Sequence, residues 1–206
     1  MIEGGSTLPA PDSLLAAMAH RRSMGLSRLR PDPVDPKLVE RMLRAADWAP
    51  SHGETEPWRF TIFAGEGRAR LADLYGDAYL DGAGDVVDPA KLEAFRARAF
   101  AAPVWIAIGL EPGRKEDGSP KMSEEDEGMA VACAVQNLHL MASAQGLAGM
   151  WHSKGVSIHP SVARGLGLVA PARLLGFFMA GWPNCEWPEG ERRPLEEKVR
   201  WIDSQR

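Results

Sequence analysis

The chain has no apolar run close to the roughly 20 residues that a membrane-spanning helix needs. It also has no excess of basic residues, because 24 Lys and Arg stand against 28 Asp and Glu and the basic residues form no stripe. Residues 1–11 lack the basic-then-apolar pattern of a secretory signal. These absences predict a cytoplasmic protein whose partners include neither nucleic acid nor a membrane.

Familiar enzyme motifs are missing as well. Gly82-Ala83-Gly84 is not followed by the helix start of a dinucleotide-binding loop, and there is no Walker loop, no Gly-x-Ser-x-Gly elbow and no His-Glu-x-x-His. The two cysteines are far apart and match no metal spacing, and the five histidines show no ligand spacing. His139, in the middle of a predicted helix, is interpreted as a satisfied core residue. The sequence therefore disfavours a Rossmann domain and a metal enzyme.

What is present is an ordinary globular composition, with 45% hydrophobic and 25% charged residues. A chain of 206 residues can form one domain with a sizeable core, or one single-domain subunit of a dimer. No repeat or low-complexity tract divides it. We expect an N-terminal tail over residues 1–11, a single domain over 12–200 and a C-terminal tail over 201–206.

Hydrophobic periodicity, capping residues and prolines divide the chain into alternating elements. Helices are predicted over about 12–22, 35–49, 67–79, 89–101, 123–145 and 160–166, and strands over 58–64, 103–110, 147–151 and 174–180. Helices outnumber the strands, which is typical of an α+β or α/β three-layer domain. The charged segment 111–122, which contains Gly and Pro, is predicted to be a mobile loop.

The longest predicted helix is unusual because Met129 to Met141 is apolar on nearly every face. Such a helix must be covered on all sides, either within a core or at a subunit interface. Cys133 lies in this run and is interpreted as a small core residue. Acidic residues after Ser123 suit the positive end of the helix dipole, which supports a helix start at that point.

Two segments carry residues that suit a phosphorylated flat ligand. Arg21-Arg22-Ser23 offers two guanidinium groups and a hydroxyl, which bind phosphate well. The alternative is that the arginines only complement the C-terminal end of a helix. The proline-bounded loop from Pro50 to Pro57 leads into an aromatic strand and can present backbone amides to a planar group. Taken singly, neither feature decides between these interpretations.

The ordered set of motifs resembles the flavin mononucleotide (FMN)-dependent nitroreductase family, and within it a small, minimal subgroup of NAD(P)H nitroreductases. The motifs are the helix ending in Arg21-Arg22-Ser23, Leu43 to Ser51, and Pro57-Trp58-Arg59-Phe60. Gln145 to Trp151, Ala180-Gly181-Trp182-Pro183 and Glu191 to Glu197 follow in the same order. The resemblance extends over about residues 12 to 200.

The resemblance implies a central, mainly antiparallel sheet flanked by helices, and a homodimer that binds FMN at the subunit interface. It assigns the phosphate and ribityl chain to Arg21, Arg22 and Ser23, with Arg192 as a further phosphate ligand. It places Pro50, Ser51 and His52 beside the flavin ring, with Trp48 near the tail of the cofactor. Trp151, His152, Ser153, Gly181 and Trp182 would line the other side.

The implied reaction is ping-pong reduction of nitroaromatic, quinone or similar electron-poor acceptors by NADH or NADPH, with hydride transfer through flavin N5 and no catalytic side chain. Two alternatives stay open: a non-redox flavin-binding or sequestering protein, and an oxygen-dependent or dehalogenating flavin enzyme on the same fold. Glu54 and Glu56 stand where the family usually has amides. Either they turn away from the ring or they lower the flavin potential.

Overall fold

The computed structural model describes residues 8–84 and 86–202. Its centre is a four-stranded sheet in the order β1 (Trp58–Ala64), β2 (Val104–Leu110), β4 (Arg173–Gly181) and β3 (Ala148–His152). Every neighbouring pair is antiparallel. All seven residues of the central strand β2 are buried, as expected for a strand covered on both faces. The prediction of a mainly antiparallel sheet is confirmed.

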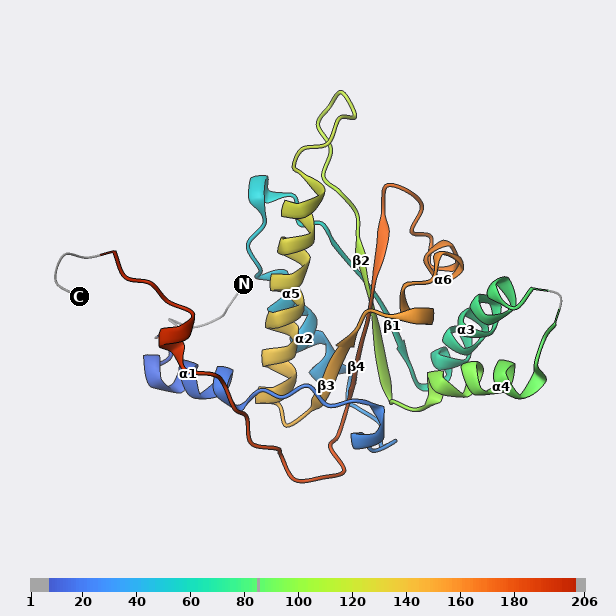
Figure 1. Cartoon of the computed structure of the whole chain (residues 1–206), viewed down its shortest axis with the longest axis horizontal. Helices are drawn as coiled ribbons and strands as arrows, with labels where there is room; N and C mark the ends of the chain where they lie inside the picture. The colour runs from blue at the N-terminus through green and yellow to red at the C-terminus, as the bar shows by residue number, and fades with distance from the viewer. Residues whose placement is uncertain (1–7, 85, 203–206) are drawn as a thin grey trace.

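Helices cover both faces of this sheet and give three layers (Figure 1). One face carries α2 (Pro36–Asp47) and α5 (Glu124–Ala144), which pack against each other and close one apolar core. The other face carries α3 (Arg68–Gly82), α4 (Pro89–Ala97) and α6 (Pro160–Gly165), around a second core. The α+β three-layer prediction is therefore confirmed, with element bounds within a few residues of those expected.

Helix α5 is buried on one side only. Ser123 caps it by accepting a hydrogen bond from the Asp126 backbone N–H at 3.0 Å. Val131, Leu138 and their neighbours face the sheet, whereas Met129, Ala132, Cys133 and Gln136 form an exposed stripe, with Met129 54% exposed. The interpretation of Cys133 as a core residue was wrong, because a helix that is apolar all round gives no periodic signal for its buried face.

Helix α1 (Pro11–His20) and the C-terminal segment 185–202 lie together beside the C-terminal end of α5 (Figure 1). None of the ten residues of α1 is buried. The Trp187 indole stacks on the His20 ring with centroids 4.7 Å apart and donates to the His20 carbonyl at 2.6 Å. Helix α1 begins one residue before the predicted start and ends two residues before the predicted end.

Segment 111–122 forms a tight hairpin at the N-terminal end of α5, with Arg114 and Pro120 as bridge partners. It packs on the loop after α2, because a Cβ on Gly53 would lie 2.5 Å from the Met122 methyl group. Its mobility stays a prediction. In the part of the chain described, no helix combines the length and apolar character required to cross a membrane.

Candidate functional site

A cavity of about 360 Å³ lies where the end of α1 crosses α5 and the edge strand β3. Ser23 forms a parallel bridge with Gly149, which fixes the chain after α1 to the free edge of β3. Three elements therefore contribute side chains to one cavity. Its lining consists of Arg21, Ser23, Ala132, Val135, Gln136, His139 and Trp151.

Arg21 supplies the positive charge of this cavity. Its guanidinium is 3.3 Å from the Ser23 hydroxyl and 3.4 Å from His139 Nδ1, both at the long end of hydrogen-bonding distance. Burial, and after it the charges of Arg192 and Arg22, lower the pKa of the Arg21 guanidinium. No carboxylate among the described residues lies within ion-pairing distance of Arg21. An anion would compensate this charge.

His139, which sequence analysis placed in the core, holds Arg21 in position. Its Nε2 lies 2.9 Å from the Arg22 carbonyl oxygen, so Nε2 carries the proton and Nδ1 accepts from Arg21. The ring also packs edge-on against Phe178 with centroids 5.0 Å apart. Burial and the Arg21 charge lower the pKa of His139 to about 4. The sequence predicted that His139 is satisfied, but it contained no signal for its partner.

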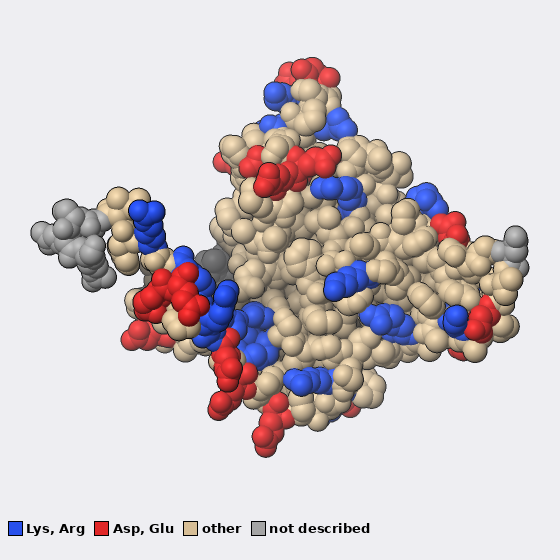
Figure 2. Space-filling model, viewed as in Figure 1, with Lys and Arg blue, Asp and Glu red and all other residues tan. Residues whose placement is uncertain are grey.

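The two adjacent arginines have different surroundings. The Arg22 guanidinium donates to the backbone carbonyls of Ala19, Arg21 and Pro188, and therefore ties the C-terminal segment to the end of α1. A Cβ on Gly190 would lie 2.2 Å from the Arg22 guanidinium carbon, so a larger residue there would require the Arg22 side chain to move. Arg192 is exposed, close enough to Arg21 to act on its pKa. Figure 2 shows Lys and Arg atoms gathered between α1 and the C-terminal end of α5.

Trp151 and His152 leave β3 on opposite faces, as consecutive strand residues do. The Trp151 indole packs on the α5 side and donates to the Leu175 carbonyl at 3.0 Å. His152 lines a second cavity of about 420 Å³ on the other face, with Nδ1 2.9 Å from the Ser157 hydroxyl. Ser153 follows as an exposed residue. The structure thus separates two residues that the resemblance assigned together.

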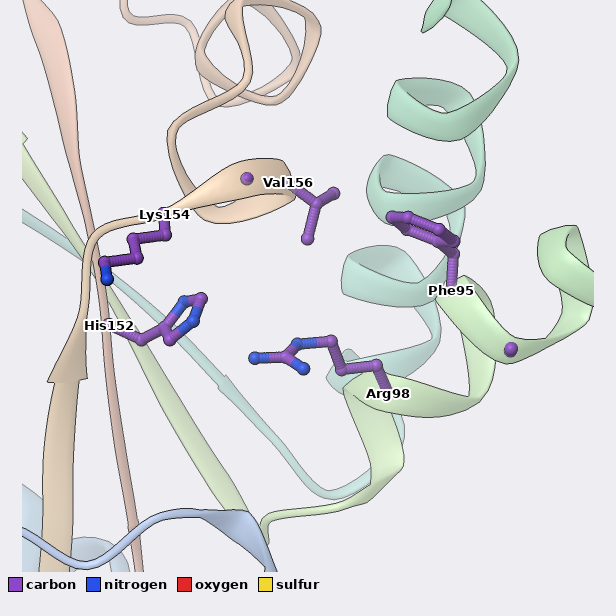
Figure 3. A pocket seen from close by; sticks show the side chains of 7 residues that line it. Phe95, Arg98, His152, Lys154 and Val156 are labelled. Atoms are coloured by element: carbon purple, nitrogen blue, oxygen red, sulfur yellow. The ribbon is translucent and has the colours of Figure 1, made fainter. Parts of the chain in front are cut away.

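The second cavity lies between α4, the turn Arg98–Phe100 and the turn Gly155–Ile158. In Figure 3 the Arg98 guanidinium points toward the His152 ring, and Phe95 and Val156 face each other. Lys154 completes the charged side. No motif in the sequence pointed to Arg98, because a single arginine at a helix end is not distinctive. Its lining consists of Ala94, Phe95, Arg98, His152, Lys154, Gly155 and Val156.

The loop with Pro50, Ser51 and His52 lies at the other end of α5. His52 Nδ1 is 3.7 Å from Asp126 Oδ1 in the first turn of that helix, whereas Arg21 contacts His139. At about 1.5 Å per residue, the 13 residues from Asp126 to His139 separate these two parts by about 20 Å. Within one chain, the loop and the arginine cavity are distinct.

This loop is held by its own hydrogen bonds. Ser51 Oγ accepts from the Glu56 backbone N–H at 3.1 Å, and Thr55 Oγ1 donates to the buried Glu127 carboxylate at 2.7 Å. Glu54 and Glu56 adopt left-handed backbone with φ of 55° and 43°. Both are exposed in this chain. Such backbone is strained for side chains larger than glycine.

The remaining assigned residues lie outside both cavities. Trp48 ends α2 and is 75% exposed. Gly181 is buried at the end of β4, where a Cβ would lie 2.9 Å from Pro103. The Trp182 indole donates to the Pro33 carbonyl at 3.1 Å. In this chain, Gly181 and Trp182 join the sheet to the segment before α2.

Comparisons with known proteins match most of this chain. The family model of the nitroreductase family matches residues 18–182. The Escherichia coli (strain K12) protein called "Putative NAD(P)H nitroreductase YdjA" is 33% identical over 172 residues, which are 84% of this chain and 89% of that protein.

Solved structures share the fold. A nitroreductase-like protein from Bacillus cereus superposes with a TM-score of 0.77 at 24% identity, covering 98% of this chain and 100% of that one. The FMN-dependent nitroreductase NfnB from Mycobacterium smegmatis, in complex with NADPH, superposes with a TM-score of 0.68 at 18% identity, covering 93% and 99%. By its sequence match over most of its length, this chain belongs to the nitroreductase family.

Proposed function

We propose that this protein is an FMN-dependent NAD(P)H oxidoreductase that reduces small electron-poor acceptors as a homodimer. The observation that carries the proposal is the half-buried Arg21 guanidinium, which has no carboxylate partner among the described residues and lines a cavity beside Trp151. The relatives support the cofactors, since one is named for NAD(P)H and a structural neighbour is FMN-dependent with NADPH bound.

The residues of the cavity suit a phosphorylated flavin. Arg21 and Arg192 would hold the phosphate through charge-assisted hydrogen bonds, and the Ser23 hydroxyl and Gln136 amide would meet the polar chain. His139 holds Arg21 toward the cavity, which keeps a long side chain ordered for binding. When bound, FMN supplies the electron-transfer chemistry, while the protein binds and orients it.

A second copy of the chain would complete the site. The Pro50–Gly53 loop lies about 20 Å along α5 from Arg21, estimated from the helix rise. The exposed apolar stripe of α5 and the uncovered helix α1 offer a surface for a partner. A two-fold pairing would bring the loop of one chain to the arginine cavity of the other. Its backbone amides would then face the flavin ring.

The experiment is an absorbance spectrum of the purified protein with FMN, followed by anaerobic titration with NADH and NADPH. Flavin bands that bleach on addition of reduced nicotinamide, and recover with a quinone or nitroarene, are expected. Bands that never bleach would favour the non-redox flavin-binding alternative. A preparation that binds no FMN would refute the proposal.

A further inference from the structure

The second cavity has the size of a small-molecule site. Its volume of about 420 Å³ falls in the range of roughly 300–1,000 Å³ typical of small-molecule sites. A neighbouring hollow of about 290 Å³ shares Phe95, Gly155 and Val156 with it and extends toward Tyr79 and His159. The two together form an elongated space whose wall comes from elements of one chain.

The positive charges of this cavity are not compensated. Arg98 is partly buried, and its Nε is fully buried with no hydrogen-bond partner. Lys154 and Arg98 make no side-chain ion pair with any carboxylate in the described ranges. Burial is the largest cause that lowers the pKa of His152, and the charges of Arg98 and Lys154 lower it further. Like charges around a partly buried space are costly unless an anion joins them.

The opposite wall is apolar. Ala94, Phe95 and Val156 line it, and Figure 3 shows the Phe95 ring and the Val156 side chain facing each other beyond the Arg98 guanidinium. Among the described residues, no carboxylate lines either hollow. An inorganic phosphate would leave this apolar wall uncovered, whereas a flat apolar body with one anionic group would meet both walls.

We propose that this cavity binds an aromatic carboxylate, with its anionic group beside Arg98 and Lys154 and its ring against Phe95 and Val156. The proposal does not depend on the proposed function, because this cavity and the Arg21 cavity lie on opposite faces of β3.

The test compares 4-nitrobenzoate with 4-nitrobenzamide, which has the same ring and nitro group but no charge. Calorimetric titration of the FMN-loaded protein gives both dissociation constants without turnover. The wild type is expected to bind the benzoate more tightly. Arg98→Gln and Lys154→Gln should each weaken that binding at least about tenfold, the loss of one charge-assisted hydrogen bond, with little change for the amide.

Lys91→Gln is the matched control, because it removes one positive charge from α4 outside the cavity. It should leave both dissociation constants unchanged. Lys154 is exposed, so Lys154→Gln tests the proposal even if Arg98→Gln fails to fold. Equal binding of the two probes by the wild type, or a preference for the benzoate that survives both substitutions, would overturn the inference.

FMN affinity, measured in the same variants, separates this site from the flavin site. If Arg98→Gln and Lys154→Gln lose FMN instead of benzoate, the cavity belongs to the cofactor and the inference is wrong. If the wild type binds benzoate through Arg98 and Lys154 but its flavin never bleaches, the proposed function fails while the binding site stands.

Discussion

The two cavities beside β3 are built from similar groups but differ in how the charge is held. Each contains a histidine whose pKa is lowered by burial and by neighbouring cations. In the first, Arg21 is hydrogen-bonded to His139 and Ser23 and lies on the exposed side of α5. In the second, the buried Arg98 Nε has no hydrogen-bond partner among the described residues, and an apolar wall lies opposite the guanidinium. The cation of the first cavity is therefore held in place by neighbouring side chains, whereas that of the second is not.

The largest predicted effect tests whether the first cavity needs a second chain to bind FMN. Cys133→Glu places a carboxylate on the exposed stripe of α5, outside both cavities. Burying it against a second copy would cost several kcal/mol, so we expect a monomer that has lost FMN. Binding of 4-nitrobenzoate to the second cavity should remain. Light scattering after size-exclusion chromatography, with flavin content, measures the first effect. Cys133→Ser is the control, and a Cys133→Glu monomer that retains FMN would refute the two-chain site.

The second prediction concerns the histidine of the first cavity. Its folded-state pKa, about 4, lies below the ordinary value of 6.5, so the unfolded chain binds more protons between these two values. Stability is therefore fully present above pH 6.5 and falls as the pH drops toward 4. Full loss amounts to about 3 kcal/mol in the free energy of unfolding.

His139→Gln isolates this contribution, because its amide can donate to the Arg22 carbonyl and accept from Arg21 without titrating. Urea unfolding at pH 7 and pH 4 should show a smaller decrease for the variant than for the wild type. Equal decreases in the two proteins would mean that His139 is not buried as a neutral ring.

The third prediction separates the two adjacent arginines. Arg21→Gln should weaken FMN binding about 10- to 100-fold, the loss of a charge-assisted phosphate contact. Arg22→Gln should weaken it less and instead release the C-terminal segment, because the Arg22 guanidinium binds backbone carbonyls. Limited proteolysis after residue 185 and FMN titration report the two effects. If Arg22→Gln has the larger effect on FMN, the roles are reversed.

Part of the fold could be predicted from local sequence signals, whereas most of the site could not. Strand β1 and the starts of α2 and α5 follow from local signals, such as an alternating strand, Asp35 before Pro36 and Ser123 before acidic residues. Motif order identified the family. The exposure of Cys133, the Arg21–His139 contact and the turn of His152 to the other face of β3 depend on tertiary packing. No local pattern encodes them.

The smallest predicted effect concerns the cations around the second cavity and the pKa of His152. Because Lys154 is among the causes that lower the pKa of His152, Lys154→Gln should raise that pKa toward its ordinary value. The Ser157 hydroxyl remains 2.9 Å from His152 Nδ1, so the ring should keep its orientation and only its electrostatic surroundings should change. Titration of the His152 ring protons by NMR measures the shift, and Lys91→Gln serves as the control. Addition of 4-nitrobenzoate to the wild type should raise the same pKa, since an anion between Arg98 and Lys154 offsets their charges. A pKa that responds to neither change would mean that the two cations do not act on the cavity.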